Sequence, residues 1–514
     1  MDRCKGLISY DTLGSLIFGL GVLLFWALVH PEALNFQESH QLFLFSWDYL
    51  AERLSQCGGL ADYVAEFIIQ FYCLPWLGAA LTAVVFVAIQ RAFKAMLNSD
   101  SSIAVSLSFI PSLMLLCAMG DENVQLGYAI ALSAALLICF WDLHRENPAT
   151  SFGVWGFPLS YWFIGPLAAL PFCAGIIRIC AGQKPLKRKI LISGAALFWA
   201  AGTLAAIRFS LLTQFQFKEV LLGVNYHRIP LGHNLLQCLI APIALLIALP
   251  SLIGKHPGSG LKPKFAAITA SVIGVLAFGC TAAALPYCYP KAKYELMTQD
   301  LLIRQGRWEE IVSRARRYQV KTEYSSVSVN LALAKTDRLE EDMDKFHQCG
   351  MQGLLMPVVR DFFSNSSTAE AFWQLGMVNS ALRYNFDMQE AAMNDRKSGR
   401  LTTRITECQI INGRYDVARK YIARLKKSLF YRRAALEMEP YLDHPELVAQ
   451  HPVWGLKLKQ HFEKDFLYYY PNMPAMLLGL WQSCPDNKLA EAYFKASLKL
   501  NNINIPAQQE SSLH

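Results

Sequence analysis

The sequence predicts an all-α protein with two parts: a polytopic membrane domain over residues 1–285 and a soluble helical domain over residues 286–500. The first observation is the distribution of charge. The first 285 residues carry 17 Lys+Arg and 14 Asp+Glu, about 11% of positions, whereas the remaining 229 carry 31 and 26, about 25%. The second is that the long apolar runs all lie in the first part and end near 286–290. Residues 501–514 are polar and are expected to form a flexible tail.

Seven apolar runs are each expected to cross the membrane as one helix, which takes about 20 residues. They are Leu13–Val29, Leu74–Ala92, Ile103–Met119, Val124–Trp141, Ile190–Arg208, Leu235–Ile253 and Ala266–Leu285. The first run lacks a small-residue cleavage site, so it is predicted to be an uncleaved span. The stretch Phe152–Cys180 carries Gly165-Pro166 at its centre, where a helix is expected to break.

The distribution of Lys and Arg between loops favours a pair of short helices in Phe152–Cys180. With a pair, the loops on the cytoplasmic side hold 13 Lys+Arg and those on the outer side hold four; with a single span the split becomes eight against nine. Because cytoplasmic loops collect basic residues, the pair is preferred. The prediction is about nine membrane segments in the inner (cytoplasmic) membrane, with an inside N-terminus and, in a Gram-negative cell, a periplasmic C-terminal domain.

The first outer loop, residues 30–73, is long and amphipathic. Two helices are expected along the membrane interface, Gln41–Leu54 and Leu60–Phe71, joined by the turn Cys57-Gly58-Gly59. Trp47 is a predicted interfacial anchor. Thirteen cysteines show no CxxC pair, and Cys57 with Cys73 is the one pair that would merit a disulfide test.

Several function classes are disfavoured. The net charge of +8 comes largely from short loops between spans, so no nucleic-acid partner is predicted. The sequence contains no phosphate-binding glycine loop of the P-loop or Rossmann type, no GxSxG and no HExxH. A nucleotide-driven pump and a hydrolase of a standard class are therefore not expected.

The soluble part repeats a turn between two helices. The turns begin at Gly306, Asp337, Gly376 and Gly413, and equivalent positions lie 31, 39 and 37 residues apart. These spacings bracket the 34-residue period, so the region resembles tetratricopeptide repeats and is predicted to form an α-solenoid. The aromatic and alanine positions are read as packing between repeats. A concave surface for a protein or glycan partner is the functional alternative.

Acidic residues gather in the predicted outer loops. Glu38 follows the first span, and Asp121 and Glu122 form most of the loop Gly120-Asp121-Glu122-Asn123. Converged carboxylates could act as a general base or bind Mg²⁺ or Mn²⁺, with Asp121 and Glu122 as the metal ligands. The alternative is that these acids are solvated caps or markers of topology.

Basic residues for an anionic lipid head are expected in the loop Phe209–Gly232. Arg228 stands beside His227, and Lys218 lies ten positions earlier. An arginine in an outer loop opposes the usual charge bias, and its planar fork suits phosphate. The alternative is an arginine that packs the loop.

The layout resembles the GT-C class of membrane glycosyltransferases. The matching features are the early acid Glu38, the helices Gln41–Leu54 and Leu60–Phe71, the pair Asp121-Glu122, and Phe152–Cys180 with its break. That class often carries a helical soluble domain at its C-terminus. The early acid follows Gln37, whereas many members have an Asp-Glu pair. The resemblance implies a polyprenyl-phosphate-linked sugar as donor.

Further strings resemble an uncharacterised multi-span membrane protein family of Bacteroidota with a tetratricopeptide-like C-terminal region. They are Glu38–Phe45, Gly58–Tyr63 and Asn412–Tyr421. This second similarity spans most of the chain and implies an architecture without an activity.

Two functions follow as hypotheses. The first is a GT-C-type glycosyltransferase acting on the outer face of the inner membrane, with Glu38, Asp121 and Glu122 catalytic and with Lys218, His227 and Arg228 binding the substrate. The second is a non-enzymatic scaffold for envelope assembly, in which the spans contact membrane lipids and the repeats dock a partner. The scaffold predicts that the carboxylates can be replaced together without loss of function.

Overall fold

A computed structural model describes residues 10–183, 185–222, 234–255, 257–258, 260, 262–359, 361–392, 396–465 and 472–501. The described residues form helices and no strand, so the all-α prediction is confirmed. The chain divides into two compact units. The membrane bundle comprises Met1–Glu38 and Ser46–Lys291, and the helical domain comprises Ser39–Phe45 and Ala292–His514. The predicted tail lies outside the described residues except for its first residue, Asn501.

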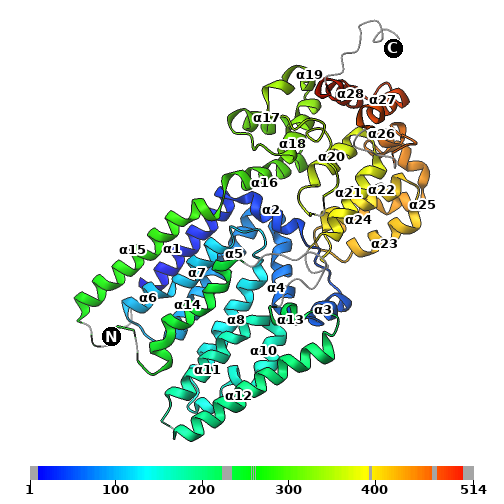
Figure 1. The fold of residues 1–514 in the computed structure, drawn as a ribbon. Helices are drawn as coiled ribbons and strands as arrows, with labels where there is room; N and C mark the ends of the chain where they lie inside the picture. The colour runs from blue at the N-terminus through cyan, green and yellow to red at the C-terminus, as the bar shows by residue number, and fades with distance from the viewer. Residues whose placement is uncertain are drawn as a thin grey trace, which may run out of the picture. The chain divides into compact units, whose positions relative to one another are not determined.

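The described residues of the membrane bundle form helices α1 to α15, of which all but α9 are labelled in Figure 1. Their bounds are α1 Tyr10–Leu24, α2 Pro31–Ser39, α3 Trp47–Leu54, α4 Gly59–Ile69, α5 Pro75–Leu97, α6 Ser102–Ser108, α7 Ile110–Ala118, α8 Leu126–Leu143, α9 Phe152–Trp155, α10 Phe157–Ile164, α11 Ala169–Ala181, α12 Leu186–Ala206, α13 Phe217–Leu222, α14 Leu235–Leu252 and α15 Pro263–Cys288. Helix α5 packs between α1 and α8, and α14 and α15 both pack on α7.

Seven helical stretches within the described residues are long and apolar enough to cross a membrane. They are Asp11–Val29, Pro75–Leu97, Leu126–Leu143, Pro148–Ala181, Leu186–Leu211, Leu235–Leu252 and Pro263–Cys288. The predicted span Ile103–Met119 is instead two short helices, α6 and α7, with Phe109 between them. Pro111 explains the break, because its ring has no N–H and clashes with the carbonyl four residues earlier.

The stretch Pro148–Ala181 folds back on itself at Gly165. Gly165 has φ +65°, a left-handed conformation that glycine tolerates, and Pro166 follows. The arms lie close together, since a Cβ at Gly153 would lie 2.6 Å from the Pro171 carbonyl oxygen. Arg178 Nη2, near the end of the stretch, donates to the carbonyl of Arg145 before its start (3.2 Å). Both ends therefore lie at one end of the bundle, as the predicted pair of short helices requires.

Large apolar side chains face outward on the bundle. Phe198 on α12 is 81% exposed, and Leu191 on α12 and Val275 on α15 are each 72% exposed. Contiguous apolar surface on this scale is uncommon on proteins in water, whereas lipid covers it at no cost. Together with the seven long helices, it marks a multi-pass membrane protein.

A buried polar chain joins three helices inside the bundle. Ser15 Oγ on α1 donates to Gln90 Oε1 on α5 (2.8 Å), and Gln90 Nε2 donates to Ser108 Oγ on α6 (2.7 Å). Gln90 and Ser108 have no exposed surface. Such bonds stabilise contacts between helices where the apolar surroundings supply no other partner.

The described residues of the helical domain form helices α16 to α28 (Figure 1). Their bounds are α16 Lys291–Arg304, α17 Trp308–Arg317, α18 Glu323–Lys335, α19 Leu339–Asp342, α20 Ser366–Leu375, α21 Val378–Glu390, α22 Gly399–Ile411, α23 Tyr415–Leu425, α24 Arg432–Met438, α25 Pro440–Asp443, α26 Trp454–Lys459, α27 Met473–Ser483 and α28 Lys488–Leu500. Sequential helices pack as antiparallel neighbours, including α17 with α18 and α20 with α21.

The four turns singled out in the sequence share one backbone geometry. Their first residues have positive φ: Gly306, Asp337, Gly376 and Gly413. At each turn the next N–H donates to the carbonyl five residues before it, at 2.8–2.9 Å. This is the Schellman ending of a helix, which closes the last turn and redirects the chain. The turns are thus alike, while the solenoid remains a prediction.

The segment Ser39–Phe45 from the first loop is built into the helical domain. The Gly399 N–H donates to the Gln41 carbonyl (3.1 Å), and the Phe45 N–H donates to the Lys427 carbonyl (2.8 Å). Leu42, Phe43 and Leu44 are buried. The prediction that Gln41–Leu54 is one helix is wrong in its first half, because residues 41–45 are extended and α3 begins only after its N-cap, Ser46.

Candidate functional site

The acidic turn between α7 and α8 is held in a defined conformation. Asp121 Oδ1 accepts from the backbone N–H and from the Nδ2 of Asn123, each at 3.0 Å. Asp121 Oδ2 accepts from Nδ2 of Asn234, the N-cap of α14, at 3.2 Å. Both Asp121 and Glu122 are half-buried. Asn234 directly follows the loop that carries His227 and Arg228 in the sequence, so α14 begins beside the acidic turn.

A stacked pair of rings joins the start of α2 to the same end of the bundle. The His30 ring stacks on Tyr289 with centroids 4.8 Å apart, and Tyr289 Oη donates to the Leu116 carbonyl near the end of α7 (2.7 Å). His30 Nδ1 lies 2.9 Å from Glu32 Oε1. His30, which precedes α2, therefore contacts Tyr289, which follows α15 and bonds to α7 near its end.

The predicted site residues are only partly brought together. Glu38 lies in the last turn of α2 and is 3% exposed. Because a helix rises about 1.5 Å per residue, Glu38 is about 12 Å along the axis from His30. Lys218 is exposed on α13. His227 and Arg228 lie outside the described residues, so the lipid-phosphate contact remains a prediction.

The metal prediction rests on two adjacent carboxylates, Asp121 and Glu122. Among the residues that the structure describes, no group of three or more His, Cys, Asp or Glu side chains is placed to hold a metal ion. Mg²⁺ is often held by one or two carboxylates with the substrate and water completing its shell. Two carboxylates of a short turn could serve in that way, so Mg²⁺ or Mn²⁺ stays a prediction for a substrate-bound state.

The first loop holds a second charged cluster, deep between α3 and α4. Arg53 Nε donates to Glu66 Oε2 (3.0 Å), and Tyr49 Oη donates to the same oxygen. All three side chains are buried, and burial together with the Glu66 charge raises the pKa of Tyr49. This cluster fastens α3 to α4 and is a structural one. Cys57 and Cys73 are not joined by a disulfide.

The helical domain contains a charged cavity of about 260 Å³. Arg400 donates to both carboxylate oxygens of Asp300 (2.7 and 3.0 Å), and Arg404 pairs with Glu370 and Glu407 at 3.1 Å each. Burial on its own would raise the pKa of Asp300, but Arg400 lowers it below its usual value. Each of these charges has a partner, so we interpret the ion pairs around the cavity as contacts that hold the helices together.

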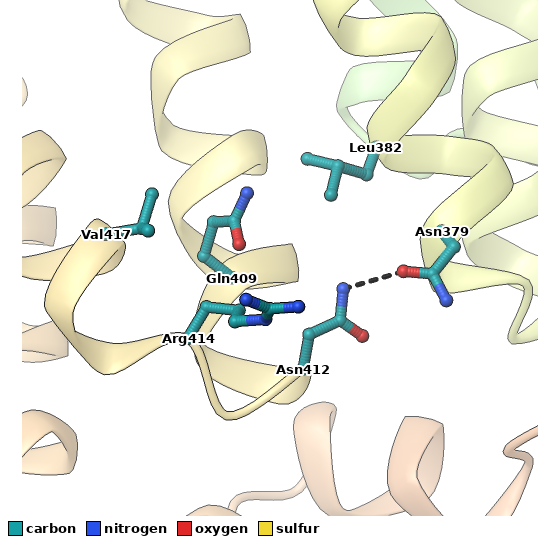
Figure 2. Close-up of a pocket in the computed structure, with 6 residues that line it drawn as sticks. All are labelled: Asn379, Leu382, Gln409, Asn412, Arg414 and Val417. Carbon is teal, nitrogen blue, oxygen red and sulfur yellow. Dashed lines mark hydrogen bonds between the residues drawn. The ribbon is translucent and has the colours of Figure 1, made fainter.

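A larger hollow of about 530 Å³ lies between α21, α22 and α23. We call it the amide pocket. Figure 2 shows its six lining residues: Asn379, Leu382, Gln409, Asn412, Arg414 and Val417. Asn412 and Arg414 flank one of the turns predicted from the sequence, where a concave surface for a partner was expected only in general terms. The feature that could have revealed the pocket is the gathering of three amides and an arginine around one helix ending.

Sequence reasoning also missed His30, Glu32, Asn234 and Tyr289 in the membrane bundle. No motif marks them, because His30 meets Tyr289 from 259 positions away and Asn234 meets Asp121 from 113 positions away. An acid two positions after a histidine at the end of a span was the available signal.

Comparison with known proteins places the chain in a family. Residues 7–504 match the model of a family of unknown function, DUF6057, and the chain belongs to this family. No curated protein and no solved structure matches the chain.

Proposed function

We propose that this member of the DUF6057 family transfers a sugar from a polyprenyl-phosphate carrier to an acceptor, at the end of the membrane bundle where α2, the acidic turn and the start of α14 lie. The observation that carries the proposal is the bond from Asn234 to Asp121. It brings the acidic turn to the start of α14, and the loop with His227 and Arg228 immediately precedes that start in the sequence.

The opposite ends of the bundle differ in charge, which supports an outward-facing site. Asp11 pairs with Arg91 at 2.6 Å and Lys94 at 2.9 Å at one end, where Arg145 and Arg178 also meet. The acidic turn lies at the other end of α7 and α8. Because basic residues collect on the cytoplasmic side, the acidic turn is proposed to face the outer side of the inner membrane.

The chemistry assigns distinct roles to the acids and the bases. The acceptor hydroxyl attacks the sugar C1, the new C1–O bond forms as the C1–O bond to phosphate breaks, and the polyprenyl phosphate leaves with the electron pair. Glu38 would take the hydroxyl proton as general base. Asp121 and Glu122 would position the substrate or a divalent ion, and Lys218, His227 and Arg228 would hold the phosphate.

The burial of Glu38 fits the role of a base. At 3% exposure its carboxylate is shielded from bulk water, which would otherwise compete with the acceptor hydroxyl for the sugar. His30 and Glu32 form a second acid-base pair at the start of the same helix, 2.9 Å apart. A carboxylate beside a histidine fixes its tautomer, so this pair is the alternative proton acceptor.

The first prediction is that Glu38→Gln abolishes transfer, by a factor of about 100 or more, because the amide cannot accept the proton. The assay measures loss of a lipid-linked sugar in reconstituted vesicles. Glu52→Gln is the matched control, since the Glu52 side chain is 48% exposed in the same loop. If Glu38→Gln keeps wild-type activity and His30→Gln is inactive, the role of general base belongs to His30. Activity in both would contradict the proposed base.

A non-enzymatic scaffold remains the second candidate, and the amide pocket favours it, because a polar hollow can dock a partner without any reaction. The scaffold predicts that Glu38→Gln and a double change of Asp121 and Glu122 to amides leave function intact. An enzyme loses activity in both variants.

A further inference from the structure

The amide pocket is rigidly framed by its own backbone. The Arg414 N–H donates to the Gln409 carbonyl (2.8 Å), and the Gly413 N–H donates to the Ile410 carbonyl (3.0 Å). Gly413 has φ +70°, which a residue with a side chain rarely adopts. This Schellman ending therefore sets the direction in which Asn412 and Arg414 leave the end of α22.

The opposite wall is fixed by a buried carboxylate. The backbone N–H groups of Asn379 and Ser380 donate to Asp465 (2.5 and 3.0 Å), and Ser380 Oγ donates to it at 2.7 Å. Asp465 is 4% exposed and thus caps the start of α21 from inside the domain. Asn379 Oδ1 then accepts from Asn412 Nδ2 at 2.8 Å, which joins the two walls (Figure 2).

Hydrogen-bonding capacity remains inside the pocket after these contacts. Across the part of the chain that the structure describes, the side chains of Gln409 and Arg414 make no hydrogen bond or ion pair, although Gln409 is only 9% exposed. Figure 2 shows the Arg414 guanidinium and the Gln409 amide directed toward the space between the lining residues, whereas the Asn412 side-chain oxygen points away from them. The Gln409 residue is 91% buried, and its amide opens onto the pocket, where a ligand can complete its hydrogen bonds.

The charge of the pocket selects the class of ligand. None of the six lining residues is acidic, and Arg414 supplies one permanent positive charge. A guanidinium binds a carboxylate through two parallel N–H···O bonds. The charged cavity of the same domain differs in this respect, because Arg400 and Arg404 there are already paired with acids.

The amides select a sugar over a peptide. Each carboxamide presents a donor and an acceptor side by side, and vicinal hydroxyls of a pyranose each donate and accept in the same way. Leu382 and Val417 offer small apolar walls for the C–H face of the ring. An extended peptide would need its polar contacts spread along a track of about 3.5 Å per residue, whereas here they surround one hollow.

We propose that the amide pocket binds a carboxylated sugar of the uronic-acid type, with Arg414 on the carboxylate and Asn379, Gln409 and Asn412 on the hydroxyls. Its volume of about 530 Å³ falls in the range of small-molecule sites. As a site that holds the acceptor, this inference rests on the proposed glycosyl transfer. As a binding site it stands alone, because it requires no donor and no reaction.

The test titrates full-length protein in lipid nanodiscs with trigalacturonic acid, without any donor. Arg414→Gln should weaken binding at least tenfold, and Gln409→Leu about tenfold. Arg419→Gln is the matched control for charge, because Arg419 lies exposed on the same helix, α23, with Asp443 as its partner; its binding should stay within twofold of wild type.

Four results would overturn the inference: no binding to wild type at 10 mM, unchanged binding in Arg414→Gln, equal binding of the neutral trisaccharide maltotriose, or tighter Arg414-dependent binding of acetyl-trialanine, which would assign a peptide. Thermal unfolding of each variant shows that loss of binding is not loss of fold. Retained binding with no measurable transfer in the wild type would contradict the proposed function alone.

Discussion

The membrane bundle and the helical domain satisfy their buried carboxylates in different ways. In the bundle, Asp142 accepts from the Phe152 and Gly153 N–H groups (2.8 and 2.7 Å) and from Ser151 Oγ (2.6 Å), all within 11 positions of it in the sequence. In the helical domain, Asp300 is paired with Arg400, 100 positions away. Asp142 is therefore satisfied by residues close to it in the sequence, whereas Asp300 depends on a contact between distant segments of the helical domain.

The helical domain also depends on a distant segment, because Ser39–Phe45 from the first loop belongs to its compact unit. Phe43 is 2% exposed and Phe45 is 55% exposed, although they are two residues apart and their ring centroids lie 5.1 Å from each other. The two phenylalanines thus offer a matched pair of substitutions.

Phe43→Ala is expected to destabilise the helical domain by about 3–5 kcal/mol, the usual cost of removing a buried phenylalanine. Phe45→Ala should cost about 1 kcal/mol, the value of the ring contact. The measurement is the protease concentration that cleaves within residues 292–501 of the full-length protein in nanodiscs. Equal sensitivity of the two variants would show that the domain is independent of the first loop.

The next prediction concerns a buried lysine of the helical domain. Lys457 is 4% exposed, donates to the Gln374 carbonyl (3.0 Å), and lies 5.8 Å from the Trp373 ring centroid. Burial lowers the pKa of Lys457 from its ordinary 10.5 to about 8. Below pH 8 the folded state holds a charge that it disfavours. Stability therefore rises as the pH increases from about 8 to 10.5, where only the unfolded state still binds the proton.

Lys457→Met should stabilise the domain at pH 7 by about 1–2 kcal/mol. The relief of the buried charge is worth about 3 kcal/mol, and the Gln374 carbonyl loses a donor worth about 1 kcal/mol. The gain should shrink as the pH approaches 10. Lys459→Met, exposed on the same helix α26, should change little at any pH. A destabilised Lys457→Met at pH 7 would show that the lysine's contacts outweigh its burial.

The sequence predicted features that depend on neighbouring residues. Gly165-Pro166 marked the break in Pro148–Ala181, and the four segments from Gly306 to Gly413 that the sequence predicted as turns between helices each begin with a positive φ. The kink at Phe109 was missed, because a single proline near the middle of an apolar run, Pro111, was weighed less than the run's length.

Features that depend on distant contacts were not predictable. The pattern of residues 41–45 fits a helix, but hydrogen bonds to Gly399 and Lys427 hold it extended. In the candidate site, the sequence placed Asp121 in a short loop between two spans. The contact of Asp121 with Asn234 could not be predicted, because it depends on α7 and α14 being neighbours. Breaks and turns could thus be predicted from the sequence, whereas contacts between distant helices could not.

The most direct test of the account is the side of the membrane on which the chain leaves the bundle. Tyr289 follows α15 and donates to Leu116 near the acidic turn, so the proposal requires the chain to leave the bundle on the side that the acidic turn faces. A phosphatase that works only outside the cytoplasm and a fluorescent protein that matures only inside it are each fused after His514. The account predicts an active phosphatase and a dark fluorescent protein. The reverse pattern would place the acidic turn in the cytoplasm and contradict the outward-facing site.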